Sequence, residues 1–543
     1  MFYPPTIPIN FLTFLLLSLF WGGVSLAFTW KTGDRSREFW VLHVLTGFFG
    51  GLASLGLLTA ISFIPDDWSA CRLSWSGGIL CGYNLYSGEA GPANGFFYPP
   101  VGAWFYILPA AFGLLFKSAQ ISLFIGWLMS LLCMLLPIFF LLRRAKNSSP
   151  SSMSASVALP CFFVGLGFIL ALPQLRYFAT MVHVDSPSAF FLGISIVLIL
   201  PLCNSKNYRS KLFFASGSLF SLAAMTKQSV WPVVPVLGIG LLLFYGWKNT
   251  LKFALAGIAT LILVAVCLLI SGENFYQAYK MIWHWPMRQA SITPVWECLR
   301  QLWLLNIPLL AASVVLIFIL IWRKIRIERK FLKSILFLLA LGAWLVPFSI
   351  LTRTKIGADT NHLALPSFFI LMALILLLYQ ILSFEILNKN AFLSSTLTAL
   401  PLLIVLVCAF NPYFKTYCGW YLWCNNSHSQ ALKYEMHNQS TEAHSRFYFP
   451  WQIFSTLIAT GKLYHIDDCL RYEESAGWKR PKESFYAFLP PQPFQIATRQ
   501  FGAPSYICEK LGMQKIVPES TYSNYFPNWA IFIGSPKSQL NTQ

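Results

Sequence analysis

The sequence predicts a polytopic α-helical membrane protein. Of its 543 residues, 56% are hydrophobic and only 11% are charged, whereas about 25% are charged in soluble proteins. Apolar runs of about 17 to 25 residues recur, and each is long enough to cross the hydrocarbon core of a bilayer as a helix. Lysine and arginine are clustered in the short segments between these runs, as the positive-inside rule predicts. Helices are expected because a spanning segment must satisfy its own backbone hydrogen bonds.

The net charge of +19 does not indicate a nucleic-acid partner, because the basic clusters are explained by membrane orientation. The first apolar run has no basic segment before it and no cleavage site of small residues. We therefore expect it to be a span.

The first two spans are expected at about 10–30 and 39–64. Lys31, Arg35 and Arg37 lie between them and place that loop in the cytoplasm. The polar segment 65–120 is then the first outer loop. Its stretch Val101–Phe116 is apolar but lacks a charge cluster marking a cytoplasmic end. It predicts a helix lying in the outer leaflet.

Later spans are expected to alternate in direction. The strongest basic cluster, Arg323–Lys333, fixes one cytoplasmic loop. About twelve spans result, with both ends of the chain outside. The remaining spans are expected at about 121–142, 156–172, 188–202, 230–246, 253–270, 303–322, 334–351, 365–384 and 392–410. One further span crosses from the basic segment that ends at Lys211 to Thr226-Lys227-Gln228.

Two domains follow: a transmembrane domain, 1–410, and a small α+β extracytoplasmic domain, 411–543, whose mixed helix and strand patterns are broken by prolines. Cys71 and Cys81, and likewise Cys418 and Cys424, are close in sequence on the side assigned as outer. An oxidising compartment would permit at least one disulfide, with its connectivity open. A metal site is disfavoured because no cysteine and histidine cluster has zinc spacing.

Carboxylates of the membrane domain gather on the outer side, among them Asp66, Asp67, Glu89 and Asp185. Transfer of a sugar to a hydroxyl needs a carboxylate to accept the proton. Simpler roles are also open. Asp66 and Asp67 could cap a helix or mark the interface, and Asp185 could be an N-cap followed by Pro187.

Cations on the same side could stabilise a leaving phosphate. Lys227 lies between two apolar runs, where a charge points to a functional partner unless its side chain snorkels to the interface. A second group comprises Arg353, Lys355, Asn361 and His362. The positive-inside rule does not explain basic residues on the outer side, so an anion such as a lipid phosphate is favoured over simple headgroup anchoring.

These motifs together resemble the GT-C superfamily of membrane glycosyltransferases, in particular protein O-mannosyltransferases and lipid A aminoarabinose transferases. The resemblance covers most of 65–366 and rests on the order of the motifs. They are Asp67 at the opening of the first outer loop, Gly82, Tyr98-Pro99-Pro100, His183-Val184-Asp185, Thr226-Lys227-Gln228, and the segment from Gly357 through Asn361 and His362 to Pro366.

The resemblance implies a GT-C-like fold and inverting transfer of a sugar from a polyprenyl-phosphate donor to a lipid, glycan or protein hydroxyl. Asp67, with Asp66 competing for the role, would be the catalytic base, and Asp185 a second acid that positions the acceptor or a metal. The predicted substrate-binding residues are Tyr98, Lys227, Arg353, Lys355, Asn361, His362 and Glu89. No cofactor is implied with certainty, and a divalent cation, Mg²⁺ or Mn²⁺, is left open.

The sequence departs from the family pattern by placing two spans before the acidic loop and Cys71 where a tyrosine is common. A transporter or flippase of lipid-linked sugars is one alternative, although such proteins usually carry ionisable residues in the middle of spans. An O-antigen polymerase or ligase is another. The expected location is the bacterial inner membrane with the site on the outer face, in contact with membrane lipid.

Overall fold

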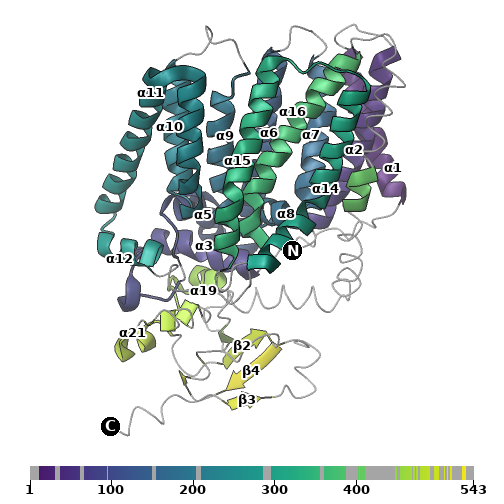
Figure 1. Ribbon diagram of the computed structural model, residues 1–543. Helices are drawn as coiled ribbons and strands as arrows, with labels where there is room; N and C mark the ends of the chain where they lie inside the picture. The colour runs from purple at the N-terminus through teal and green to yellow at the C-terminus, as the bar shows by residue number, and fades with distance from the viewer. Residues whose placement is uncertain are drawn as a thin grey trace.

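The computed structural model describes residues 11–30, 37–61, 67–94, 96–148, 154–202, 210–284, 295–354 and 360–386, and short separate segments between 402 and 533. Upright helices form a bundle, short helices lie across its lower end, and a small sheet lies below them (Figure 1). The helices up to residue 386 are α1 (Phe11–Trp30), α2 (Arg37–Ile61), α3 (Asp67–Leu80), η1 (Gly88–Ala90), α4 (Val101–Phe105), α5 (Ile107–Leu115), α6 (Ala119–Ser148), α7 (Ser154–Ala171), α8 (Pro173–Thr180), α9 (Asp185–Ile199), α10 (Ser210–Ala224), η3 (Gln228–Val233), α11 (Val234–Ile270), α12 (Phe275–Tyr279), η4 (Lys280–His284), α14 (Val295–Trp322), α15 (Arg329–Arg353), η5 (Thr360–Leu363) and α16 (Ala364–Ile386).

The structure is that of a helical membrane protein. Among the described residues, five helices are long and apolar enough to cross a membrane, and a sixth is formed if Val157–Ala171 and Pro173–Thr180, which meet at 97°, are one bent span. Shorter apolar helices cover Thr13–Ala27, His43–Leu58 and Asp185–Ile199. The total of about twelve spans and the GT-C arrangement stay predictions, and most of the last expected span, 392–410, lies outside the described residues.

The longest apolar segment, Gln228–Ile270 with 43 residues, turns back on itself at Gly246. Its φ of 73° and ψ of 171° lie outside the helical region, in a conformation that favours glycine. Near this turn, Lys252 Nζ donates to Ser210 Oγ at 2.8 Å, at the start of α10. At the opposite end of the bundle from this turn, Gln228 Nε2 donates to Phe97 O at 3.2 Å, and Leu268 belongs to the same buried cluster as Tyr86 and Phe96. Both ends of the segment therefore lie at the lower end of the bundle.

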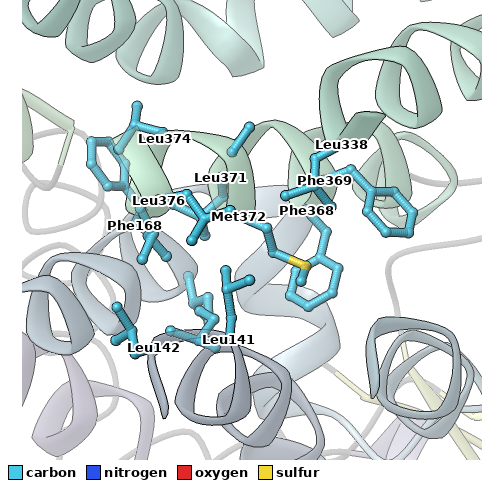
Figure 2. Packing of buried hydrophobic residues seen from close by; sticks show 14 of the residues in the cluster. Leu141, Leu142, Phe168, Leu338, Phe368, Phe369, Leu371, Met372, Leu374 and Leu376 are labelled. Carbon is cyan, nitrogen blue, oxygen red and sulfur yellow. The ribbon is translucent and has the colours of Figure 1, made fainter. Parts of the chain in front are cut away.

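The core of the bundle is organised around α16. Of the candidate spans this helix is the most enclosed, with 89% of its apolar window buried. Figure 2 shows its side chains Phe368, Leu371 and Met372 facing Leu141 and Leu142 of α6. Because lipid chains are as apolar as these residues, the packing contributes through close van der Waals contact and not through removal from water.

Close helix contact also depends on small residues. At Gly217 of α10, an added Cβ would lie 2.1 Å from the carbonyl oxygen of Phe253 in α11. Backbone atoms cannot move aside as the end of a flexible side chain can. The α10 and α11 helices therefore approach each other only because residue 217 is glycine, as in small-residue packing between membrane helices generally.

The C-terminal segments form a four-stranded sheet in the order β1-β2-β4-β3, with β1 parallel to β2 and the other neighbouring pairs antiparallel. The described C-terminal segments therefore contain both helices and strands, as expected for an α+β domain. Helix α19 packs on α3, where Phe454 and Leu457 reach within 3 Å of a Cβ built at Gly77. The elements are β1 (Phe447–Tyr448), α19 (Ile453–Thr460), α21 (Lys482–Ala487), β2 (Gln495–Arg499), β3 (Gln514–Ile516) and β4 (Trp529–Ile533).

His465 joins this C-terminal part to the loop that follows α3. Its Nδ1 accepts a hydrogen bond from Ala93 N at 2.8 Å, and its Nε2 lies 3.1 Å from Phe485 O. Ile466 N donates to Ala93 O at 2.8 Å. The imidazole must therefore be neutral, with its proton on Nε2. Burial accordingly lowers the pKa of His465 from 6.5 to about 3, and the nearby Arg480 charge acts in the same direction.

Closeness in sequence does not bring Cys71 and Cys81 within bonding distance of each other. Cys71 lies in α3, and Cys81 follows the last residue of the same helix. Ten residues of helix separate their Cα atoms by roughly 15 Å at about 1.5 Å per residue, whereas a disulfide needs less than about 7 Å. No disulfide joins these two residues, and Cys418 and Cys424 lie outside the described part of the chain.

Replacing Gly217 with alanine should destabilise the protein by about 1 to 3 kcal/mol, because the new methyl group would collide with the backbone of Phe253. Gly238→Ala is the matched control. Residue 238 lies in α11 with nothing within 4 Å of a built Cβ, so alanine there should be neutral or stabilising. Thermal unfolding of both variants in detergent checks this, and equal effects would contradict the close contact.

Acidification should release the loop from His465. A depressed folded-state pKa gives a contact that is strongest above pH 6.5 and weakens as the pH falls from 6.5 toward about 3. Between pH 6.5 and 5.5 the loss should be about 1 kcal/mol. Hydrogen exchange of the Ala93 amide, corrected for its intrinsic pH dependence, measures it. His465→Asn, which keeps an acceptor near the Nδ1 position without a titrating group, should remove the pH dependence.

Candidate functional site

Three connecting segments meet beside α3, which lies at the lower end of the bundle in Figure 1. They are residues 96–101, which run into the first residue of α4, 181–184 before α9, and 225–227 after α10. Val101 N donates to Met225 O at 3.0 Å, which joins the first turn to the third. A Cβ at Gly102 would lie 2.5 Å from Val184 Cγ1. The start of α4 and the second turn therefore also touch, and a larger residue at 102 would require Val184 to shift.

The turn before α9 is held from several sides. Ser69 Oγ of α3 accepts a hydrogen bond from Val182 N at 3.0 Å. Tyr106, between α4 and α5, donates its hydroxyl to His183 O at 3.1 Å and lies 2.8 Å from Ser130 Oγ of α6. These contacts fix the backbone that presents Asp185 as the first residue of α9.

Asp185 is the centre of a buried polar cluster. Its Oδ1 forms an ion pair with Lys227 Nζ. Its Oδ2 accepts a hydrogen bond from Asn361 Nδ2 at 2.8 Å and faces His183 Nδ1. Asp185 and Lys227 are only 1% and 4% exposed. A charge buried this deeply is tolerated only when it is paired and hydrogen-bonded, as both are.

His183 extends the cluster toward the outer loop. Burial and the nearby positive charge of Arg72 together lower its pKa from 6.5 to about 3, so the ring is neutral at neutral pH. Its Nδ1 faces Asp185, and its Nε2 lies 3.5 Å from the Tyr98 hydroxyl.

The cluster carries more positive than negative charge among the described side chains. The guanidinium of Arg72, in α3, interacts electrostatically with Asp185, Tyr98 and Tyr177. His362 also lies near enough to act on Asp185. Lys227 and Arg72 thus surround one described carboxylate. Such an arrangement favours an anionic group, for example a phosphate.

The predicted site residues fall into three groups. Asp185, Lys227, Asn361 and Tyr98 are brought together, the last through His183. His362 lies close enough to interact electrostatically with Asp185.

The second group has its described contacts elsewhere. Glu89 forms an ion pair with Lys280 at 3.4 Å, and Arg353 Nε donates to Gln301 Oε1 at 3.3 Å. The contacts seen for Glu89 and Arg353 do not join them to the Asp185 cluster.

The third group lies beyond the description. Asp66 and Lys355 are outside the described residues, and Asp67 opens α3 with its side chain outside the description. Within the described part of the chain, no three acidic, histidine or cysteine side chains could hold a metal ion together. A divalent cation therefore stays an open prediction.

Sequence reasoning assigned no role to Arg72 or Glu273. Arg72 is the one charged residue of the apolar helix α3 after its first position, and a lone charge in an apolar helix could have identified it. Glu273 accepts hydrogen bonds from Leu85 N at 2.5 Å and Tyr86 N at 3.0 Å and so holds the loop that follows α3. Its partner is a backbone turn nearly two hundred residues away, which no local pattern reveals.

Comparison with known proteins finds no family model, no curated protein and no solved structure that matches the chain.

Removing one member of the Asp185 pair should destabilise the protein strongly. Lys227→Met leaves a buried carboxylate without its cation and should cost about 3 to 5 kcal/mol, whereas adding Asp185→Asn to it should recover part of the loss. Thermal unfolding in detergent measures the cycle. Lys280→Met is the control, since its pair with Glu89 is partly exposed and should contribute at most about 1 kcal/mol. If the losses of stability in Lys227→Met and Asp185→Asn simply add in the double variant, the two residues are not coupled.

Proposed function

We propose that this protein is a GT-C-like membrane glycosyltransferase that moves a sugar from a polyprenyl-phosphate donor to an acceptor hydroxyl on the outer face of a bacterial inner membrane. The observation that carries the proposal is the buried Asp185, Lys227 and Asn361 cluster at the end of the bundle covered by α3. These residues come from three separate motifs of the resemblance.

The position of the cluster supports an outer-face site. The basic loop at Arg323 and Lys324 joins the end of α14 to the start of α15, and Asn361 follows the far end of α15. The cluster is thus one helix length from the loop that the positive-inside rule assigns to the cytoplasm. A lipid-linked donor would approach within the bilayer, with its phosphate at the depth of the headgroups.

In the proposed reaction, the acceptor oxygen attacks the anomeric carbon of the donor sugar. The acceptor proton passes to the carboxylate of Asp67, in the role of general base. The bond between the anomeric carbon and the phosphate oxygen breaks as the new glycosidic bond forms on the opposite face, which inverts the configuration. Lys227 and Arg72 stabilise the negative charge that develops on the leaving polyprenyl phosphate.

Asp185 has a supporting part in this scheme. Its carboxylate holds the Lys227 ammonium in place, and its second oxygen orients Asn361. Because Asp185 already neutralises Lys227, the net positive charge offered to a phosphate comes from Arg72, with Arg353 and Lys355 as further predicted cations. Tyr98, Glu89 and His362 stay predicted contacts of the substrate.

The proposal is tested with the purified full-length protein in detergent and a panel of radiolabelled polyprenyl-phosphate sugars, with cell-envelope lipid and protein fractions as acceptors. Asp67→Asn should lower the rate of transfer by about 10² to 10⁴, the range for loss of a general base. Donor binding, read from thermal stabilisation, should change less than tenfold. Glu474→Gln, which removes an exposed carboxylate of the C-terminal part paired with Lys510, should transfer at the wild-type rate.

A wild-type protein that binds no lipid-linked sugar would refute the proposal, and full transfer by Asp67→Asn would refute the assigned base. Movement of the donor between leaflets of proteoliposomes without any transfer would instead identify a flippase.

A further inference from the structure

The loop between α3 and α4 connects the C-terminal part of the protein to the proposed site. Trp75 Nε1 donates to Asn94 O at 2.6 Å, and the Tyr86 hydroxyl donates to Tyr98 O at 2.6 Å. Tyr98 in turn faces His183. A chain of direct contacts therefore runs from this loop to the partner of Asp185.

Arg480, in the C-terminal part of the protein, binds the same loop. Its Nη1 donates to Glu89 O at 2.9 Å and to Gly91 O, and its Nη2 donates to Gly88 O at 3.3 Å. The side chain is 7% exposed. One guanidinium thus binds three backbone carbonyls of a single turn, a geometry that its planar set of donors allows and a lysine ammonium does not.

The guanidinium is itself held in place. Both carboxylate oxygens of Glu473 accept from Nη2, at 2.8 Å and 2.7 Å. Ser484, which lies 3.2 Å from Arg480 Nη1, donates its hydroxyl to Glu89 O at 2.7 Å. If the loop moved away, a buried charged group would lose several of its acceptors, which is strongly unfavourable. The loop is therefore coupled tightly to the C-terminal part.

We propose that Arg480 is a positioning residue: through the backbone of Gly88 to Gly91 it holds the loop between α3 and α4 so that Tyr98 stays against His183, the neighbour of Asp185. A role of Arg480 in catalysis rests on the proposed function, whereas its role in holding the loop does not. Arg480 touches no reacting atom in this scheme. The C-terminal part thereby becomes a component of the site and not an independent appendage.

The test compares Arg480→Met with wild type by hydrogen exchange and mass spectrometry on the full-length protein in detergent. Amides of residues 85–94 should exchange at least tenfold faster in the variant, and so should those of 96–103 and 181–186, which lie beyond the loop. Ser484→Ala, which removes one bond to Glu89 O, should give a smaller increase of about threefold. This milder variant keeps the test valid if Arg480→Met does not fold.

Lys510→Met is the matched control. It removes a cation of the same C-terminal part from an exposed pair with Glu474 at 3.0 Å, and it should leave all three segments at the wild-type rate. Arg480→Lys, which keeps the charge but not the planar set of donors, should protect the loop only in part. Unchanged exchange in 85–94, or a loosened loop with wild-type exchange in 96–103 and 181–186, would overturn the proposal.

Transfer assays form a separate arm. If Arg480 acts through Tyr98, Tyr98→Phe combined with Arg480→Met should lose no more activity than the larger of the two single losses. If the two losses of activity multiply in the double variant, Arg480 does not act through Tyr98, and its proposed role in catalysis is overturned. Absence of any transfer by wild type would refute the glycosyltransferase proposal alone, since the exchange measurements decide the loop position without it.

Discussion

A single buried carboxylate, Asp185, sets the geometry of the lower end of the bundle. A carboxylate in an apolar environment requires a cation and hydrogen-bond donors, and Lys227 and Asn361 supply them from α10 and α15 connections that are distant in sequence. Satisfying this one group therefore brings the segments before α9, after α10 and after α15 to one place. The glycine contact at Gly102 and the hydroxyl of Tyr106 then hold the turns at the distances that the ion pair needs.

The rest of the molecule supplies two kinds of support for this cluster. From above, α16 and its neighbours fix the helix ends by close packing, in which small residues such as Gly217 set the spacing. From below, α3 and the outer loop are enclosed between the bundle and the C-terminal part, whose Phe454 and Leu457 pack on Gly77. The site lies where these two supports meet, so neither the bundle nor the C-terminal part defines it alone.

The sequence was sufficient to predict the membrane class and most individual helices, because long apolar runs and basic clusters are local signals. It also singled out Asp185 and Lys227, since ionisable groups beside apolar runs are unusual, and Asn361 through its place in the segment that resembles the GT-C pattern. It could not reveal that Glu273 caps the turn at Leu85, because that contact joins distant segments. It left the disulfide connectivity open, and closeness in sequence does not make Cys71 and Cys81 a pair, because the helix between them keeps the sulfurs apart.

Arg480 binds the main-chain oxygens of Gly88, Glu89 and Gly91. The Glu89 side chain instead pairs with Lys280. The attachment through Arg480 therefore does not depend on which side chain residue 89 carries. A substitution at residue 89 therefore changes the side chain that the loop presents without removing this attachment. A fixed main-chain attachment with replaceable side chains is the same division of labour by which antibody frameworks support variable loops.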